Sequence, residues 1–92
     1  MSDFRVFETD QFLDDLEKIS PARRDKIAGK LRDLVYPQLR TRPYFGAHIK
    51  KLKGFKPETW RCRIGPYRFF YIVDDKEKIV FMVAADTRQQ SY

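Results

Sequence analysis

The sequence predicts an α+β fold in which a small antiparallel sheet packs against an N-terminal αα-hairpin. Two segments with helical spacing precede residue 38, and strand-forming segments separated by turn residues fill most of the remaining chain. The expected order of elements is β-α-α-β-β-β-β, and consecutive hairpins make the later strands antiparallel. With 92 residues, the chain has room for one domain, residues 1–92, with a small core.

Residues 4–8 have the composition of a short strand, and the helix that follows has a clear start signal. Thr9 or Asp10 can cap this helix, because their side-chain oxygens accept a hydrogen bond from the first helical turn. The apolar residues of the helix then fall on one face: Phe12, Leu13, Leu16 and Ile19.

A second helix begins at Ser20-Pro21, with serine as the N-cap and proline in the first turn. From Ile27 onward its apolar residues recur at the spacing of one helix face. Pro37 cannot continue the pattern, since it lacks a backbone N–H, so we expect the helix to end near Val35 or Tyr36. The tight turn between the two helices makes them an αα-hairpin.

The second half of the chain carries the strand signals. Residues 38–47 contain a proline and a glycine and predict a loop. Residues 48–53 form a weak strand pattern, and residues 54–57 predict a turn. Residues 78–85 form a nearly uninterrupted run of apolar residues between two turn signals, which predicts a strand buried on both faces.

The central hairpin is the most informative segment. Strand-like residues 58–65 and 67–74 meet at Gly65-Pro66, and a two-residue loop with glycine first fits a type II′ turn. That register sets Arg63 directly opposite Arg68. Strand side chains alternate between faces, so Arg61 also shares this face. Like charges in opposite positions destabilise a sheet, and such an arrangement indicates a bound anion.

Charge is unevenly distributed along the chain. The net charge is +6 and the pI is near 9.6, which favours acidic partners, nucleic acid being the commonest. Residues 38–63 hold eight Lys or Arg and one acidic residue, whereas eight of the 13 acidic residues precede Val35. The basic part of the chain therefore coincides with the predicted sheet.

Composition also limits where the protein acts. No apolar run reaches the roughly 20 residues of a membrane span, and no signal peptide opens the chain. The single cysteine, Cys62, cannot form an internal disulfide and lies on the apolar strand face of Trp60 and Ile64. We therefore expect a buried thiol, a cytoplasmic location and no membrane contact.

Several segments together resemble the RelE/ParE superfamily of bacterial and archaeal toxins. They are Lys51-Leu52-Lys53-Gly54, Trp60-Arg61-Cys62-Arg63-Ile64-Gly65, Pro66-Tyr67-Arg68-Phe69-Phe70-Tyr71, and Arg88 with Tyr92 four residues later. The resemblance covers roughly the last half of the chain, and the preceding strand and helical hairpin fit the same family. The motif is moderately specific as a whole.

The resemblance implies the toxin of a type II toxin–antitoxin pair. The RelE branch cleaves mRNA in the ribosomal A site, while the ParE branch inhibits DNA gyrase. RelE-type sites use basic residues on the sheet, an arginine near the chain end and a nearby tyrosine. The positions that match are Arg61, Arg63, Arg68, Arg88 and Tyr92. ParE-type members tend to lack part of this basic set, and its completeness here favours the RNase branch.

The implied partners are the ribosome with its mRNA and a cognate antitoxin that contributes an acidic or amphipathic segment. The toxin–antitoxin complex would bind operator DNA through the antitoxin. The resemblance implies neither a metal nor a cofactor.

Cleavage by attack of a ribose 2′-OH needs a base, a group that stabilises the phosphorane and an acid for the leaving 5′-oxygen. Guanidinium groups suit the second role, which we assign to Arg68 and Arg63. Arg88 would act at the leaving oxygen, and Tyr92 would stack on a splayed base.

The base stays open, because arginine almost never releases its proton. The remaining candidates are His48, Lys53 and Glu58. Histidine exchanges protons most readily near neutral pH, which favours His48, although a lone histidine is more often structural. Groups of the ribosome are a further source.

Further basic residues are candidates for RNA phosphate contacts. Lys50, Lys51 and Lys53 precede the hairpin, and Arg23, Lys26 and Lys30 share one face of the second helix, where ordinary solubility is the alternative explanation. Tyr67, Phe69 and Tyr71 alternate on the opposite strand face and are expected in the core rather than at bases.

Two functions of other classes compete with the ribonuclease. One is a ParE-like toxin that inhibits gyrase by protein binding, in which the helical hairpin matters more than the arginines. The other is an RNA- or DNA-binding module without activity, which predicts salt-dependent binding and no toxicity.

Overall fold

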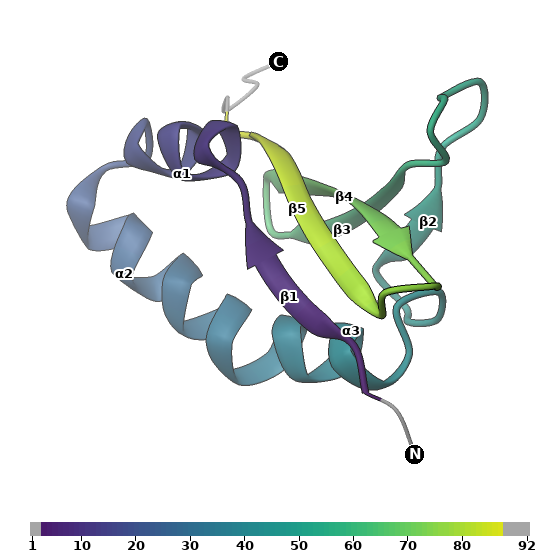
Figure 1. Ribbon diagram of the computed structural model, residues 1–92. Helices are drawn as coiled ribbons and strands as arrows, with labels where there is room; N and C mark the ends of the chain where they lie inside the picture. Colours follow the sequence, from purple (N-terminus) through teal and green to yellow (C-terminus); the bar gives the residue numbers. More distant parts are fainter. Residues whose placement is uncertain (1–2, 88–92) are drawn as a thin grey trace.

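The computed structural model describes residues 3–87, which form a five-stranded mixed sheet with all helices on one face (Figure 1). The elements are β1 (Arg5–Glu8), α1 (Asp10–Glu17), α2 (Pro21–Lys30), the π-helical turn η1 (Leu31–Val35), α3 (Tyr36–Thr41), β2 (Ile49–Lys51), β3 (Trp60–Ile64), β4 (Tyr67–Asp74) and β5 (Ile79–Asp86). The strand order is β1-β5-β4-β3-β2.

The predicted α+β class and order of elements are confirmed. Strands β2 to β5 pair antiparallel in sequence order, as consecutive hairpins require. In addition, β1 pairs with β5 in parallel, with Phe7 in register with Phe81. The first strand of the chain therefore lies beside the last one, and β5 becomes an interior strand.

Helix α1 is hydrogen-bonded to β5 through its N-cap residue. Of the two predicted cap residues, Thr9 is the N-cap, and its Oγ1 accepts a hydrogen bond from the Phe12 N–H at 3.3 Å. The same hydroxyl donates to the Met82 carbonyl at 2.8 Å. The cap of the helix is thus also an anchor to the sheet.

The second helix does not end before Pro37, and this prediction was wrong. Residues Leu31–Val35 form a π-helical turn, in which the Tyr36 N–H donates to the Leu31 carbonyl five residues earlier. Pro37 then falls in the first turn of α3, where a missing N–H is tolerated. A wide turn ahead of the proline therefore lets the helix continue. As a result, residues 38–41 are helical, and only residues 42–47 of the predicted loop are irregular.

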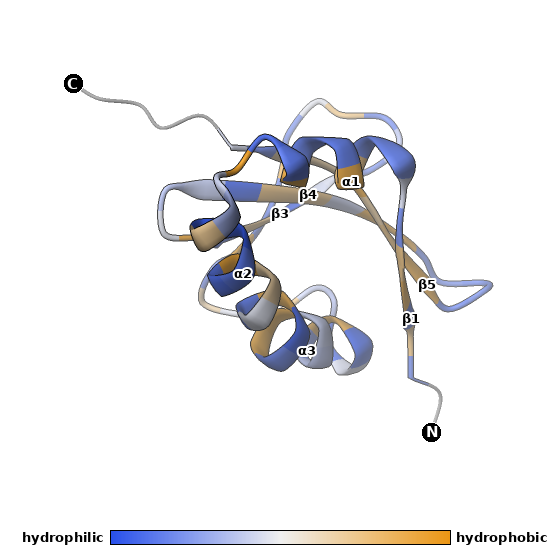
Figure 2. Ribbon diagram, turned by 90° about the vertical axis from the view of Figure 1, so that its left-hand side faces the viewer, coloured by the Kyte–Doolittle hydropathy of each residue, from blue (hydrophilic) through white to orange (hydrophobic). Residues whose placement is uncertain are grey.

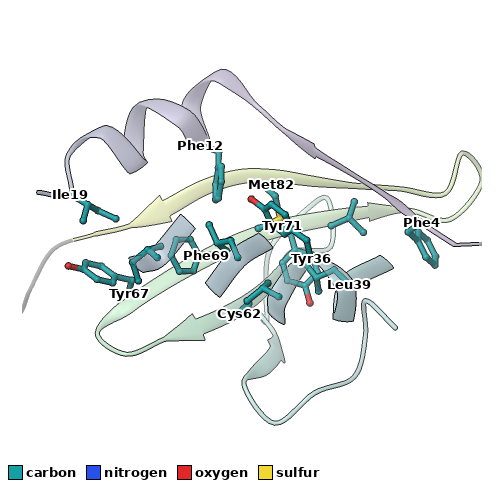
Figure 3. Packing of buried hydrophobic residues seen from close by; sticks show 14 residues of the cluster. Phe4, Phe12, Ile19, Tyr36, Leu39, Cys62, Tyr67, Phe69, Tyr71 and Met82 are labelled. Carbon is teal, nitrogen blue, oxygen red and sulfur yellow. The ribbon is translucent and has the colours of Figure 1, made fainter. Parts of the chain in front are cut away.

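The core lies between the helices and one face of the sheet (Figure 3). Its fully buried side chains come from both layers: Phe12, Leu31 and Leu39 from the helical layer, and Phe69, Tyr71, Val80 and Met82 from the sheet. The Tyr71 hydroxyl donates to the Pro43 carbonyl at 2.6 Å, and burial raises the pKa of this phenol. The 42–47 segment is therefore fastened to the core.

The other face of the sheet is left uncovered by the described helices, since α2 and α3 lie on one side only (Figure 2). The prediction that the last strand is buried on both faces was therefore wrong. Val80 and Met82 of β5 are fully buried, but Ile79 and Phe81 are only partly buried. None of the helices in residues 3–87 has the length and apolar character that crossing a membrane requires.

Asp15 of α1 is the buried charged residue of the described core, with 6% of its surface exposed. Its carboxylate accepts hydrogen bonds from the Ala85 N–H of β5 and from Gln11 Nε2, both at 2.8 Å. Lys18 Nζ lies 3.5 Å away. Asp15 therefore completes the backbone hydrogen bonding of β5 near its C-terminal end.

We expect Asp15→Ala to lower the free energy of unfolding by about 1–3 kcal/mol, because it leaves the Ala85 N–H without its acceptor. Urea denaturation measures this change. The control is Asp14→Ala, which alters an exposed residue of the same helix. Equal stability of the two variants would contradict the structural role of Asp15.

Candidate functional site

The hairpin between β3 and β4 has the predicted register. Ile64 pairs with Tyr67 and Arg63 with Arg68, so the loop consists of Gly65 and Pro66. Gly65 has a φ of 56°, a left-handed conformation that glycine adopts without steric cost. The two-residue turn thereby places Arg63 and Arg68 in opposite positions on neighbouring strands. The side chain of Arg63 turns toward the loop, where its Nε donates to the Gly65 carbonyl at 3.2 Å.

We call Arg63, Arg68 and Asp86 the arginine row, because they lie in register across β3, β4 and β5. Their strand neighbours Cys62 and Phe69 are buried in the core, so the row lies on the uncovered face. Arg68 Nη1 is 3.7 Å from Asp86 Oδ2. The row therefore consists of two cations followed by one carboxylate.

Arg61 lies next to the row, two residues before Arg63 on the same strand face, opposite Lys50 on one side and Phe70 on the other. Its Nε is buried and has no hydrogen-bond partner among the described residues. A buried donor without an acceptor costs about 1–3 kcal/mol.

The three predicted base candidates are not gathered beside Arg68. Glu58 pairs with Lys51 at 3.2 Å, and Lys51 is in register with the core-facing Trp60, on the opposite side of the sheet. Lys53 lies in the turn after β2. The His48 carbonyl accepts from the Arg63 N–H at 3.1 Å, which places exposed His48 beyond the Arg63 end of the row.

The predicted basic face of α2 lines a groove on the helical side of the hairpin. Arg23, Lys26 and Lys30 border a groove of about 420 Å³ that also contacts Gly65 and Pro66. Lys30 and Gly65 continue into a larger groove of about 620 Å³ that includes His48 and Arg63. The basic residues of α2 thus lie in grooves that extend to the hairpin turn and to Arg63. Lys51, by contrast, does not lie on the uncovered face.

Two predicted site residues, Arg88 and Tyr92, lie outside the described residues, and their roles stay predictions. Strand β5 ends at Asp86, the last member of the arginine row.

The aromatic residues divide between the two faces as expected. Tyr67, Phe69 and Tyr71 are buried in the core, which confirms that they are not a base-stacking surface. Phe70, opposite Arg61, is partly exposed on the uncovered face and was not predicted as a site residue. Asp86 was missed as well. Alternation along β4 was a signal for Phe70, but no sequence signal places Asp86.

Cys62 lies between Arg61 and Arg63 but points into the core and is 5% exposed. Burial raises the pKa of its thiol to about 11. The predicted buried thiol is confirmed, and its protonated state near neutral pH makes it a poor nucleophile. Among residues 3–87, no three His, Cys, Asp or Glu side chains cluster as a metal would require.

Comparison with known proteins relates the chain to one family of toxins. A family model described as the ParE toxin of the type II toxin–antitoxin system, parDE, matches residues 6–92. No curated protein matches the sequence.

Several solved structures share the fold, and three of them have the following similarity and coverage. The RelBE2 toxin–antitoxin complex from Mycobacterium tuberculosis has a TM-score of 0.74 at 24% identity, over 98% of this chain and 97% of that one. The archaeal RelE–RelB complex from Pyrococcus horikoshii has a TM-score of 0.69 at 24% identity, over 99% and 100%. The YoeB/ParE toxin from Agrobacterium tumefaciens has a TM-score of 0.66 at 24% identity, over 92% and 99%.

We expect Cys62 of the folded protein to react with iodoacetamide at pH 8 at least about 100-fold more slowly than in the urea-unfolded chain, because both burial and the raised pKa suppress the thiolate. Mass spectrometry of timed samples measures both rates. The folded rate should rise as the pH approaches 11. Comparable rates for the folded and unfolded chains at pH 8 would refute the buried position.

Proposed function

The chain belongs to the ParE toxin family of the RelE/ParE superfamily, toxins of type II toxin–antitoxin systems, and we propose that it is a ribosome-dependent endoribonuclease. In this proposal the toxin cleaves mRNA when a ribose 2′-OH attacks the adjacent phosphate. Its partners are then the ribosome and mRNA in the cytoplasm. The reaction uses no cofactor.

The observation that supports this proposal is the arginine row with Arg61 beside it. Arg63 and Arg68 lie opposite each other at the cost of like-charge repulsion, and a phosphate between them would remove that cost. Guanidinium groups bind phosphate through two oxygens at once. The positive charge of Arg61, two residues before Arg63 on the same strand face, would add to the attraction for this ligand. These features are those of an oxyanion site.

In the proposed mechanism, Arg68 and Arg63 stabilise the charge that develops on the phosphorane oxygens. Lys50 and Arg61 hold the neighbouring backbone phosphates, and the partly exposed Phe70 offers a face for a base. We keep Arg88 at the leaving oxygen and Tyr92 at a base as parts of the proposal. The grooves lined by Arg23, Lys26, Lys30 and His48 continue this cationic surface toward ribosomal RNA. Lys51 and Lys53 stay part of the proposal as RNA contacts from the helical side of the sheet and from the turn after β2.

We also propose a cognate antitoxin as partner, since the RelBE2 and archaeal RelE–RelB structures are toxin–antitoxin complexes. The uncovered face is cationic around the arginine row and apolar at Phe7 and Phe81, which suits an acidic amphipathic segment. Binding there would block the RNA site. Operator DNA would be reached through the antitoxin.

The second candidate is gyrase inhibition without nuclease activity, and two observations favour it. The matching family model is described as a ParE toxin. In addition, the helical layer presents Leu13 and Leu34 to solvent, 43% and 66% exposed, as apolar contacts for a protein target.

For the ribonuclease, we expect purified toxin to cleave mRNA on programmed ribosomes, with primer extension showing new 5′ ends at codon boundaries. Arg68→Ala should slow cleavage about 100- to 1,000-fold, since it removes a stabiliser of transition-state charge. The control is Arg32→Ala, an exposed arginine whose ion pair is with Asp33. Absence of cleavage by the unaltered protein, or equal loss in both variants, would overturn the proposal.

The same preparation tested on gyrase separates the two candidates. We expect no inhibition of DNA supercoiling by the proposed ribonuclease. A gyrase inhibitor would block supercoiling, keep this effect in Arg68→Ala, and lose it in Leu34→Asp, which puts a charge on the helical layer. Agarose gels of relaxed plasmid measure all three proteins.

A further inference from the structure

We propose that Asp86 is the proton acceptor of the cleavage reaction, an inference that rests on the proposed ribonuclease function and completes its chemistry. A proton must leave the attacking 2′-OH, and the guanidinium groups around the site are poor acceptors for it. If the toxin itself supplies the base, the base must be a side chain of another type within reach of the phosphate site. Carboxylates are established general bases when they are held against their substrate.

The position of Asp86 satisfies this requirement. It is in register with Arg68 on the uncovered face, and its Oδ2 lies 3.7 Å from Arg68 Nη1. Its side chain is 20% exposed, so that a ligand can reach it while its orientation stays restrained. A phosphate held by Arg68 and Arg63 would therefore have a carboxylate on one side. By contrast, Glu58 lies toward the helical side, paired with Lys51.

A β-bulge brings Asp86 to this face. Tyr71 pairs with Met82, but Phe70 pairs with Ala84, so Val83 is an extra residue in β5. Without the bulge, the Tyr71–Met82 register would continue and Arg68 would pair with residue 85. The side chain of residue 86 would then point toward the helices. The inserted residue reverses this parity. Bulges are over-represented next to active sites because they redirect a side chain in this manner.

Helix α1 holds both ends of the bulge. Thr9 Oγ1 lies 2.8 Å from the Met82 carbonyl and 3.4 Å from that of Val83. On the other side, the Asp15 carboxylate accepts from the Ala85 N–H at 2.8 Å. The irregular part of β5 is therefore fastened by side chains before and after the extra residue. Thr9 and Asp15 are positioning residues for Asp86.

The proposed step is an internal transfer of the phosphoryl group from the 5′-oxygen to the 2′-oxygen. The 2′-OH proton moves to the Asp86 carboxylate as the O2′–P bond forms, and Arg68 and Arg63 carry the added charge of the phosphorane. The P–O5′ bond then breaks, and the 5′-oxygen takes a proton from the proposed acid or from water. The products are a 2′,3′-cyclic phosphate and a 5′-hydroxyl. The proton on Asp86 returns to solvent.

The test is single-turnover cleavage of mRNA on programmed ribosomes at saturating toxin, with binding to the ribosome measured separately. We expect Asp86→Asn to slow cleavage about 100- to 10,000-fold. Binding should be equal or tighter, because the variant removes a negative charge beside the phosphate site. Asp14→Asn, the same change on exposed α1, is the matched control. A carboxylate that only repels or orients RNA would change binding instead.

Chemical rescue supplies a second readout. Asp86→Ala should regain part of its cleavage rate when formate is added and none when the same concentration of chloride is added. Urea denaturation shows whether either variant folds less stably. Two outcomes overturn the role of Asp86 and leave the ribonuclease function standing. In the first, the unaltered protein and Asp86→Asn cleave equally well. In the second, formate does not relieve the defect of Asp86→Ala. Unaltered protein that does not cleave at all overturns the ribonuclease function and Asp86 with it.

Discussion

The site depends on the antiparallel pairing of β3 with β4 across Gly65 and Pro66. This pairing sets Arg63 against Arg68, which costs a few tenths of a kcal/mol to about 1 kcal/mol. The same register places buried Cys62 opposite buried Phe69, and burial of one large apolar side chain contributes about 1.5–3 kcal/mol. A slip of one residue would expose the core face, so the apolar side holds the two arginines together.

The division of the sheet into one covered and one open face follows from the helices. The π-helical turn allows the second helix to pass Pro37 and to extend the apolar layer as far as Leu39, which is fully buried. All described helices therefore cover the same face, and the arginine row stays accessible. An antiparallel sheet tolerates such one-sided packing because alternate residues can be apolar and polar.

Strand β5 connects stability with the site. Its bulge is fastened by the N-cap Thr9 and the buried Asp15, two polar groups of α1 that a simple apolar packing of helix on strand would not need. Their hydrogen bonds go to backbone groups of β5 on either side of the bulge, at the Met82 carbonyl and the Ala85 N–H. The bulge that these bonds flank decides which face Asp86 occupies. The hydrogen bonds that stabilise the α1–β5 contact therefore lie in the same part of β5 that sets the geometry of the site.

The sequence by itself determined the α+β class, a helix start at Thr9 or Asp10, the bounds of β4 and the arginine pair, because these depend on local periodicity and on one two-residue turn. It also separated the core aromatics from the basic face by alternation alone. Only the tertiary structure decided that the helix passes Pro37, that β1 lies beside β5, and that one face stays open. Those outcomes depend on packing between distant segments. Asp86 reaches Arg68 because of one bulge held by residues about seventy positions away, and no local pattern encodes such a shift.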